Sequence, residues 1–263
     1  MFQELLESLP MWGIFVVFAL SSGLLYELGF RLGRWWQDRT PEETEGPTGM
    51  IVGSILALMA FLLAITMGMA SDRFDARRGF VLSEANSIGT TYLRTAFLPE
   101  PQRTESRELL RAYVPLRIAP DDLDDVAAVI QAGTEILDEL WLMVEGLAAT
   151  QDGSELFALY VESLNDTIDM NTSRVVAALF ARVPETVLLL LFIGSVLTLG
   201  MVGFSAGLTR RRSPLTAIVM IVVLGAVITL VVDIDRPQGG TLTVSQRPLE
   251  DLARQVGAPT EPE

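Results

Sequence analysis

The stretch MIVGSILALMAFLLAITMGMA, residues Met50–Ala70, decides the fold because it is long, apolar and free of charged side chains. At ~1.5 Å of rise per residue, roughly 20 residues of helix cross a hydrocarbon layer ~30 Å thick. Three further runs are comparably apolar, namely Met11–Phe30, Pro184–Leu208 and Pro214–Val232. Soluble domains do not need core helices of this length and character. The sequence therefore predicts an all-α, polytopic membrane protein with four transmembrane helices.

The polar stretch between the second and third runs predicts a helical-bundle insert that grows out of the membrane helices. Apolar positions keep helical spacing from Phe74 to Leu93, so we expect the second helix to continue without a break to Pro99. The expected parts are transmembrane helices 1 and 2 (11–70), a soluble helical insert (71–183), transmembrane helices 3 and 4 (184–232) and a C-terminal extension (233–263) with a disordered end from Ala258.

Caps and prolines divide the polar regions into shorter elements. We expect helices over Pro101–Ile118, from Asp121 to about Ala149, and from Ser154 or Asp152 to Pro184. After the fourth membrane run, alternation at Thr241–Ser245 predicts a short strand, and Pro248–Val256 predicts a short amphipathic helix.

Composition excludes several classes of function. The chain has no His and no Cys, and its basic residues are all Arg, while the net charge is -14. Without His, Cys and Lys there is no thiol nucleophile, no Schiff base and no imidazole, the commonest general base, and only carboxylate chemistry is left open, so we expect no enzyme and no cofactor. The acidic charge opposes nucleic-acid binding. The lipid bilayer is the expected surrounding, with multi-pass insertion in a bacterial inner membrane.

One motif resembles a catalytic site and is better explained by packing. Residues Gly203–Gly207 read GFSAG, which fits the G-x-S-x-G nucleophile elbow. The motif lies inside an apolar helix instead of on a strand-to-helix turn, and no His is present to act as the base. Small residues in membrane helices commonly allow two helices to approach closely, so we interpret the motif as a packing surface.

The second membrane helix carries a stripe of small residues at spacings of three and four. Ordinary packing between helices is the favoured interpretation of such a face. The sharper hypothesis is that the face lines a central pore in an oligomer. The pore-lining or helix-packing candidates are Gly53, Ala57, Ala60, Ala64 and Gly68, with Gly49 at the start of the stripe.

Charged residues gather where the second and fourth membrane helices end. Arg73, Arg77 and Arg78 follow the second helix, and Asp233, Asp235 and Arg236 follow the fourth. Ion pairs between the two helices, for example of Arg77 with Asp233 or Asp235, are the favoured interpretation. The alternative is a ring of Arg at a pore mouth, which would attract inorganic anions.

Other acidic residues receive structural interpretations. Glu27 lies inside the first apolar run, where a carboxylate is costly, and an i,i+4 pair with Arg31 is its favoured explanation. Asp121, Asp122, Asp124 and Asp125 do not follow the spacing of a calcium loop and are expected to cap a helix. We expect no metal site.

The charge of the connecting loops indicates an orientation. The first helix has no Arg before it and three after it, and Arg210, Arg211 and Arg212 lie in a short loop on that same side. The positive-inside rule then places both termini and the soluble insert outside the cytoplasm.

Several segments resemble a family of bacterial membrane proteins known as bestrophin-like. They are SDRFDARR at 71–78, EANSIGTTYLR at 84–94, LP at 98–99, RAYV at 111–114, LNDTID at 164–169 and DIDRP at 233–237 with Gly240. The resemblance covers nearly the whole chain and supports four membrane helices with a helical insert. Bestrophins are pentameric anion channels, so the resemblance implies a homo-oligomer. It also implies a cytosolic insert, against the orientation given by the loop charges.

These observations together favour an oligomeric ion channel, expected to conduct anions such as chloride, with the second helix facing the pore. The alternative is a non-conducting membrane scaffold or sensor whose helical bundle binds a partner. Paired Arg and Asp at the helix ends, with a sealed second helix, would favour that alternative.

Overall fold

A computed structural model describes residues 9–40, 46–118, 126–151, 153–179, 182–236 and 240–259. The described residues form helices and contain no strand. They divide into two compact units. Unit 1 comprises Met1–Phe74 and Arg182–Thr243, and unit 2 comprises Asp75–Ala181 and Val244–Glu263. One long helix, α3 (Gly46–Arg94), contributes to both.

Unit 1 contains the apolar helices that the sequence predicts. These are α2 (Met11–Arg39), the first part of α3, α7 (Glu185–Leu208) and α8 (Pro214–Asp235). Among the described residues, four helices are long and apolar enough to cross a membrane, and these are the four. The prediction of an all-α protein with four membrane helices is confirmed, although α2 continues past Phe30 and includes the Trp35–Trp36 pair.

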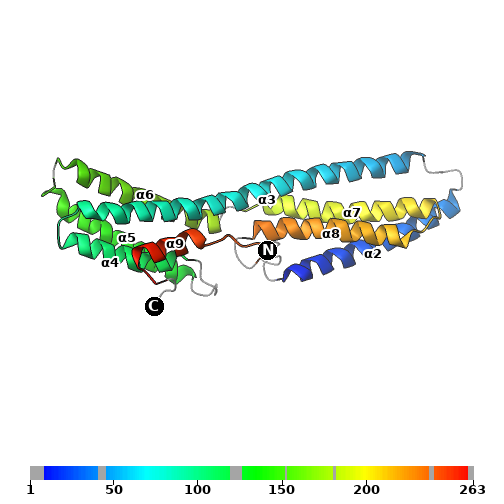
Figure 1. Cartoon of the computed structure of the whole chain (residues 1–263). Coiled ribbons are helices and arrows are strands. Elements are labelled where there is room, and N and C mark those ends of the chain that lie inside the picture. Colours follow the sequence, from blue (N-terminus) through cyan, green and yellow to red (C-terminus); the bar gives the residue numbers. More distant parts are fainter. Residues whose placement is uncertain are drawn as a thin grey trace. The chain divides into compact units, whose positions relative to one another are not determined.

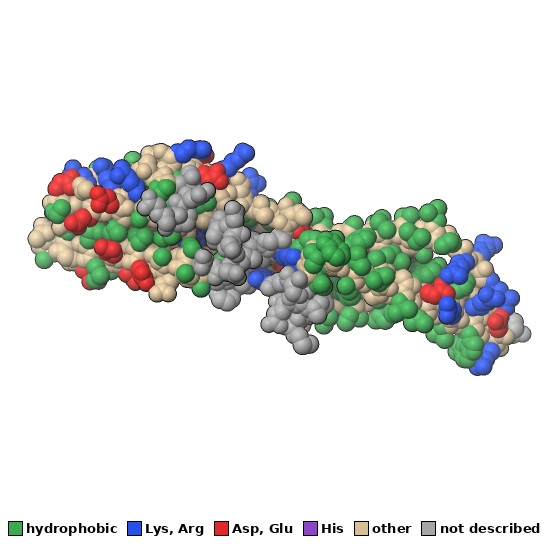
Figure 2. Space-filling model, turned by 90° about the horizontal axis from the view of Figure 1, so that it is seen from below, with side chains coloured by type: hydrophobic (Ala, Val, Ile, Leu, Met, Phe, Trp, Pro, Cys, Tyr) green, Lys and Arg blue, Asp and Glu red, His purple; other side chains and the backbone are tan. Residues whose placement is uncertain are grey.

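The helices of unit 1 bury one side and leave the other apolar. α2 packs along α7 and α8 (Figure 1). Phe18 is fully buried and meets Phe192 edge-to-face, with ring centroids 5.6 Å apart. Leu20, Leu190 and Leu215 are among many large apolar side chains that stay exposed, and Figure 2 shows apolar side chains covering the visible face of these helices. Such an outer surface fits lipid as its solvent.

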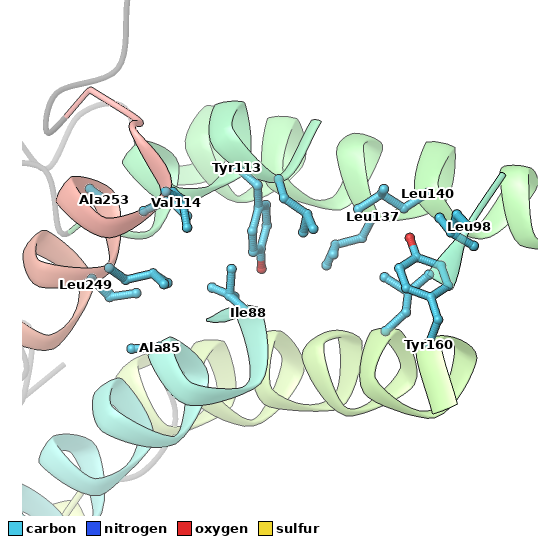
Figure 3. Close-up of a cluster of buried hydrophobic side chains, with 14 of the residues drawn as sticks. Ala85, Ile88, Leu98, Tyr113, Val114, Leu137, Leu140, Tyr160, Leu249 and Ala253 are labelled. Carbon is cyan, nitrogen blue, oxygen red and sulfur yellow. The ribbon is translucent and has the colours of Figure 1, made fainter. Parts of the chain in front are cut away.

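Unit 2 is a group of helices around its own core. It contains the second part of α3, a 3-10 turn η1 (Thr95–Phe97), α4 (Gln102–Arg117), α5 (Val126–Ala148), α6 (Glu155–Leu179) and α9 (Arg247–Val256). Tyr113 and Tyr160 are the largest fully buried side chains (Figure 3). Around them pack Ile88, Leu98, Leu110, Leu137, Leu140, Leu164 and Leu249.

Three elements differ from the prediction. The second helix, expected to continue to Pro99, ends at Arg94 and is followed by the 3-10 turn η1. Thr241–Ser245 is not a strand, because the N–H and hydroxyl of Thr241 bond to the Asp233 carboxylate and no neighbouring strand offers a ladder. The helix expected to reach Pro184 ends at Leu179, and residues 182–184 are not helical. A proline disfavours helical backbone at the residue before it, and Val183 instead donates its N–H to Asp235 at 2.8 Å.

The expected caps have different outcomes. The Ser154 hydroxyl accepts the Phe157 N–H at 3.3 Å, so Ser154 caps α6 as one of the two candidates. Asp152, the other candidate, lies outside the described residues, as do Asp121, Asp122, Asp124 and Asp125. The end expected to be disordered begins at Ala258, whose N–H donates to the Ala253 carbonyl at 2.9 Å. Residues 260–263 are outside the description.

Candidate functional site

Two surfaces in unit 1 are rich in small residues, and the first is a glycine seam between α2 and α7. We use this name for Gly29, Gly33, Gly203 and Gly207. A Cβ atom on Gly203 would overlap the carbonyl oxygen of Tyr26, and one on Gly207 would overlap that of Phe30. The two backbones therefore touch directly. The GFSAG motif is a packing surface, as the sequence analysis concluded.

The second surface is the α3 lane, which consists of Gly49, Gly53, Ala57, Ala60, Ala64 and Gly68. All six residues are exposed. A Cβ atom on Gly49, Gly53 or Gly68 would meet no atom within 4 Å. The described residues therefore leave the lane uncovered, and the choice between helix packing, the favoured interpretation, and pore lining stays a prediction.

α3 has two other faces over the same length. Its buried face consists of Val52, Met59, Thr66 and Ala70, which pack toward the rest of unit 1. Met59 lies so close to Gly194 on α7 that a Cβ there would come within 2.8 Å of its sulfur. The third face carries the large exposed side chains Ile51, Leu58, Phe61 and Ile65. Large apolar side chains of this kind can contact lipid or a second protein surface. The lane differs from this third face because it has no side chain larger than a methyl group.

Polar residues follow the lane along α3. Asp72 is exposed at the end of the unit 1 part, four residues after Gly68 of the lane and seven after Ile65 of the third face. Within unit 2, the exposed face of α3 carries Asp75, Gly79, Ser83, Asn86 and Thr90, again at spacings of three and four.

The three arginines of this region have different environments. Arg77 is only 6% exposed, so it points away from the exposed face. Arg73 is partly buried, and Arg78 is exposed at the edge of that face. The centre of the exposed face at this level thus carries Asp72 and Asp75 instead of arginine.

The residues after α8 form a clasp within unit 1. The buried carboxylate of Asp233 accepts the Thr241 N–H at 2.7 Å and also bonds the Thr241 hydroxyl. The Asp235 carboxylate accepts the N–H of Val183, which lies just before α7. The Arg236 guanidinium donates to the carbonyl of Leu9, just before α2, at 2.8 Å. These side chains hold the ends of three segments together. The predicted pairing of Arg77 with Asp233 or Asp235 stays a prediction.

Glu27 has the partner that its spacing predicts. Its carboxylate accepts a hydrogen bond from Arg31 at 3.0 Å and also pairs with Arg212 from the loop between α7 and α8. Arg210 of the same loop pairs with Asp38. The charges gather at this end of the apolar surface (Figure 2). Glu27 is thus part of a structural charge cluster.

Unit 2 contains a buried ion network that the sequence analysis missed. Glu84 is 0% exposed and accepts a hydrogen bond from Arg117 Nε at 2.6 Å and another from Arg174. Arg174 also donates to Gln246 at 2.9 Å. The network therefore joins α3, α4, α6 and the segment before α9. A signal was present, since Glu84 shares its helical face with the buried apolar residues Val81 and Ile88.

The chemistry available at these sites is limited. Among the described residues, no group of three or more Asp and Glu side chains is arranged to hold a metal ion. Burial raises the pKa of Tyr113, so its hydroxyl stays protonated in unit 2. The α3 lane is the feature that the packing of one chain leaves unexplained.

Comparison with known proteins identifies the family. A family model described as the bestrophin-like domain matches residues 15–249. Among curated proteins, none matches the chain. Crystal structures of a bacterial bestrophin homologue from Klebsiella pneumoniae share the fold. A single-residue variant of it has a TM-score of 0.66 at 14% identity, over 92% of this chain and 95% of that one.

Two further structures agree. Another structure of the Klebsiella pneumoniae homologue gives a TM-score of 0.63 at 13% identity, over 92% of this chain and 94% of that one. A structure described as a membrane protein gives 0.65 at 12% identity, over 94% of this chain and 95% of that one. At identities of 12–14%, these structural similarities show the fold alone. The family model, in contrast, matches most of the sequence and shows the family. The chain belongs to the bestrophin-like family.

Proposed function

We propose that this protein is an oligomeric membrane ion channel in which the α3 lane faces the conduction path. The observation that carries the proposal is the exposure of the lane in a single chain. Six small residues follow one another along a membrane-length helix, and they are exposed within the part of the chain that the structure describes. In membrane proteins a small-residue face either meets another helix or leaves space. Further copies of the chain would supply either outcome.

Several copies around one axis would enclose a path lined by their α3 lanes. Closed cyclic symmetry is the usual form of homo-oligomers, and the number five is expected from the likeness to bestrophins alone. Glycine and alanine keep such a path open because their side chains occupy little of it. The large apolar residues of the third face of α3, such as Leu58 and Ile65, would then turn toward lipid or toward a neighbouring copy.

The conducted ion could be an anion or a cation, and different residues favour each. Anion conduction is the first candidate, because Arg73, Arg77 and Arg78 follow the membrane part of α3 and because the chain resembles bestrophins. Cation conduction is the second candidate, and the position of Asp72 on the exposed face favours it, because a ring of carboxylates attracts cations. Burial of Arg77 takes one of the three guanidinium groups off the exposed face of α3.

Reconstitution in a planar bilayer tests the proposal. The purified protein is placed between unequal KCl solutions, and the reversal potential gives the sign of the preferred ion. We expect ohmic or gated current, and we expect Asp72→Asn to move the reversal potential toward anion preference if carboxylates control selection. A protein that is oligomeric yet never conducts across voltage and pH would contradict the channel and favour the non-conducting scaffold.

A further inference from the structure

In unit 2 the exposed face of α3 has two different flanks. Thr91 on one side donates to the Ser163 carbonyl of α6 at 2.8 Å. On the other side Gly89 adjoins Leu252 of α9, and the ring of Tyr92 lies beside Arg111 of α4. Between these contacts lie the exposed residues listed above, from Ser83 to Thr90. Helical geometry thus puts α6 and the α4–α9 pair on opposite sides of the exposed face.

The α6 flank is acidic. Glu155, Glu162, Asp166 and Asp169 are exposed and fall on one stripe of the helix. Glu162 pairs with Arg94 at 3.6 Å, whereas Asp166 and Asp169 pair with no arginine in the described part of the chain. Together with α3, the stripe borders a polar groove of about 240 Å³. The groove is lined by Asn86, Ser87, Thr90, Arg94, Glu162 and Asp166, with Ser163 at its base.

The α4 flank is basic where it borders α3, at Arg107 and Arg111, while Glu105 and Glu108 are exposed further round the helix. Arg107 and Arg111 lie one turn apart, and both guanidinium groups stand over the Tyr92 ring, at 5.6 and 5.7 Å from its centroid. Arg107 donates to the Thr95 hydroxyl and Arg111 to the Val256 carbonyl. Neither guanidinium pairs with a carboxylate among the described residues. The two positive charges are therefore held in place and uncompensated within one chain.

The two flanks also match in height along α3. Thr91 lies level with Ser163 on α6, and the adjacent Tyr92 lies level with Arg111 on α4 through a hydrogen bond of 2.8 Å. In a ring whose axis runs along α3, cyclic symmetry keeps each residue at the same height in every copy. The α6 flank of one copy then faces the α4 flank of the next, with Arg111 level with the stretch from Glu162 to Asp166.

We infer that the acidic α6 flank binds the basic α4 flank of a second copy of this chain, in a head-to-tail contact. The inference rests on the proposed oligomer with α3 toward its axis, and it adds the surfaces that join the copies. Charge complementarity selects the partner: the groove offers carboxylates, and the neighbour's guanidinium groups are the cations that fit them. Exposed Leu156 and Leu159 of α6, near the acidic stripe, supply apolar area for the same contact.

Cysteine cross-linking tests this contact, because the chain has no native Cys. Ala158→Cys on α6 and Thr104→Cys on α4 keep all the charges and are exposed positions on the two flanks. Two differently tagged copies, each with one of the substitutions, are co-expressed in full length and treated with a short bis-maleimide. We expect a cross-linked dimer that carries both tags, and a ladder of higher products when both substitutions are in one chain.

A matched control replaces Thr104→Cys by Leu142→Cys, an exposed position on α5. This pair should give little cross-linked product. Adding Asp166→Arg and Asp169→Arg should lower the yield of the Ala158–Thr104 product about tenfold, because like charges then meet.

Mass measurement in detergent separates the possible failures. A multi-copy particle that gives no more Ala158–Thr104 product than the control pair overturns the contact and leaves the proposed channel standing. A particle with the mass of one chain overturns both.

Discussion

The glycine seam and the α3 lane contain the same kinds of residue at the same spacing, yet their surroundings are opposite. At Gly203 there is no room for a methyl group, whereas at Gly53 a methyl group would meet nothing within 4 Å. The seam is explained by the fold of one chain, while the lane is a surface that one chain does not use. Small residues in a membrane helix thus allow either a close approach or an open space, and only the structure says whether helices of the same chain fill it.

Among the substitutions considered, one in the buried ion network of unit 2 should lower stability the most, because its charges lie inside the protein, whereas the two small-residue surfaces carry none. Replacing Glu84→Ala leaves Arg117 and Arg174 close together without their carboxylate. Loss of one partner of a buried ion pair costs about 3–5 kcal/mol, so we expect unit 2 to unfold at markedly lower temperature or denaturant concentration. The loss of stability is measured as a lower melting temperature, with circular dichroism in detergent as the signal. A melting point equal to that of the native protein would show that the network adds nothing.

The seam itself should be sensitive to a single methyl group. Gly203→Ala forces α2 away from α7, because the new Cβ overlaps the Tyr26 carbonyl oxygen. Overpacking of this kind costs about 1–3 kcal/mol. Gly53→Ala on the lane is the matched control and should leave the melting point of one chain unchanged. Equal changes in melting point for Gly203→Ala and Gly53→Ala would contradict the difference between the two surfaces.

A larger side chain on the lane should affect conduction more than stability. Ala60→Phe points away from the interior, so we expect a change in unfolding free energy within about 0.5 kcal/mol. The same ring in each copy would narrow the path, and the single-channel current should fall by about tenfold or more. Bilayer recording measures this, with Leu58→Phe on the third face of α3 as the control. An unchanged current in Ala60→Phe would show that the α3 lane does not line the conduction path.

The smallest expected effect concerns the clasp after α8. Thr241→Val keeps the N–H bond to Asp233 and removes the hydroxyl bond, so a loss of about 1 kcal/mol is expected. Gly240→Ala is the stronger companion, because a Cβ there would come within 2.8 Å of Asp233 Oδ1. If Thr241→Val destabilises more than Gly240→Ala, the hydroxyl and not the close approach holds the clasp.

The sequence was sufficient for the membrane helices, because length and apolar composition are local properties. It also predicted the Glu27–Arg31 pair and the continuity of α3, both of which follow from helical periodicity. It could not assign the lane, since periodicity does not tell which side of a helix its own chain covers. The Glu84 network required knowledge that Arg117 and Arg174, far apart in sequence, reach one point. Thr241–Ser245 failed as a strand because alternation alone supplies no pairing partner.

Thiol accessibility along α3 tests the central claim most directly, since no native Cys interferes. Ala60→Cys is exposed to a charged, membrane-impermeant methanethiosulfonate during bilayer recording, with Ile65→Cys on the third face as the comparison. We expect rapid loss of current in Ala60→Cys and none in Ile65→Cys, because a path lined by the α3 lane would expose Ala60 to water and leave Ile65 outside it. Modification of Ile65→Cys with Ala60→Cys left untouched would contradict the central claim.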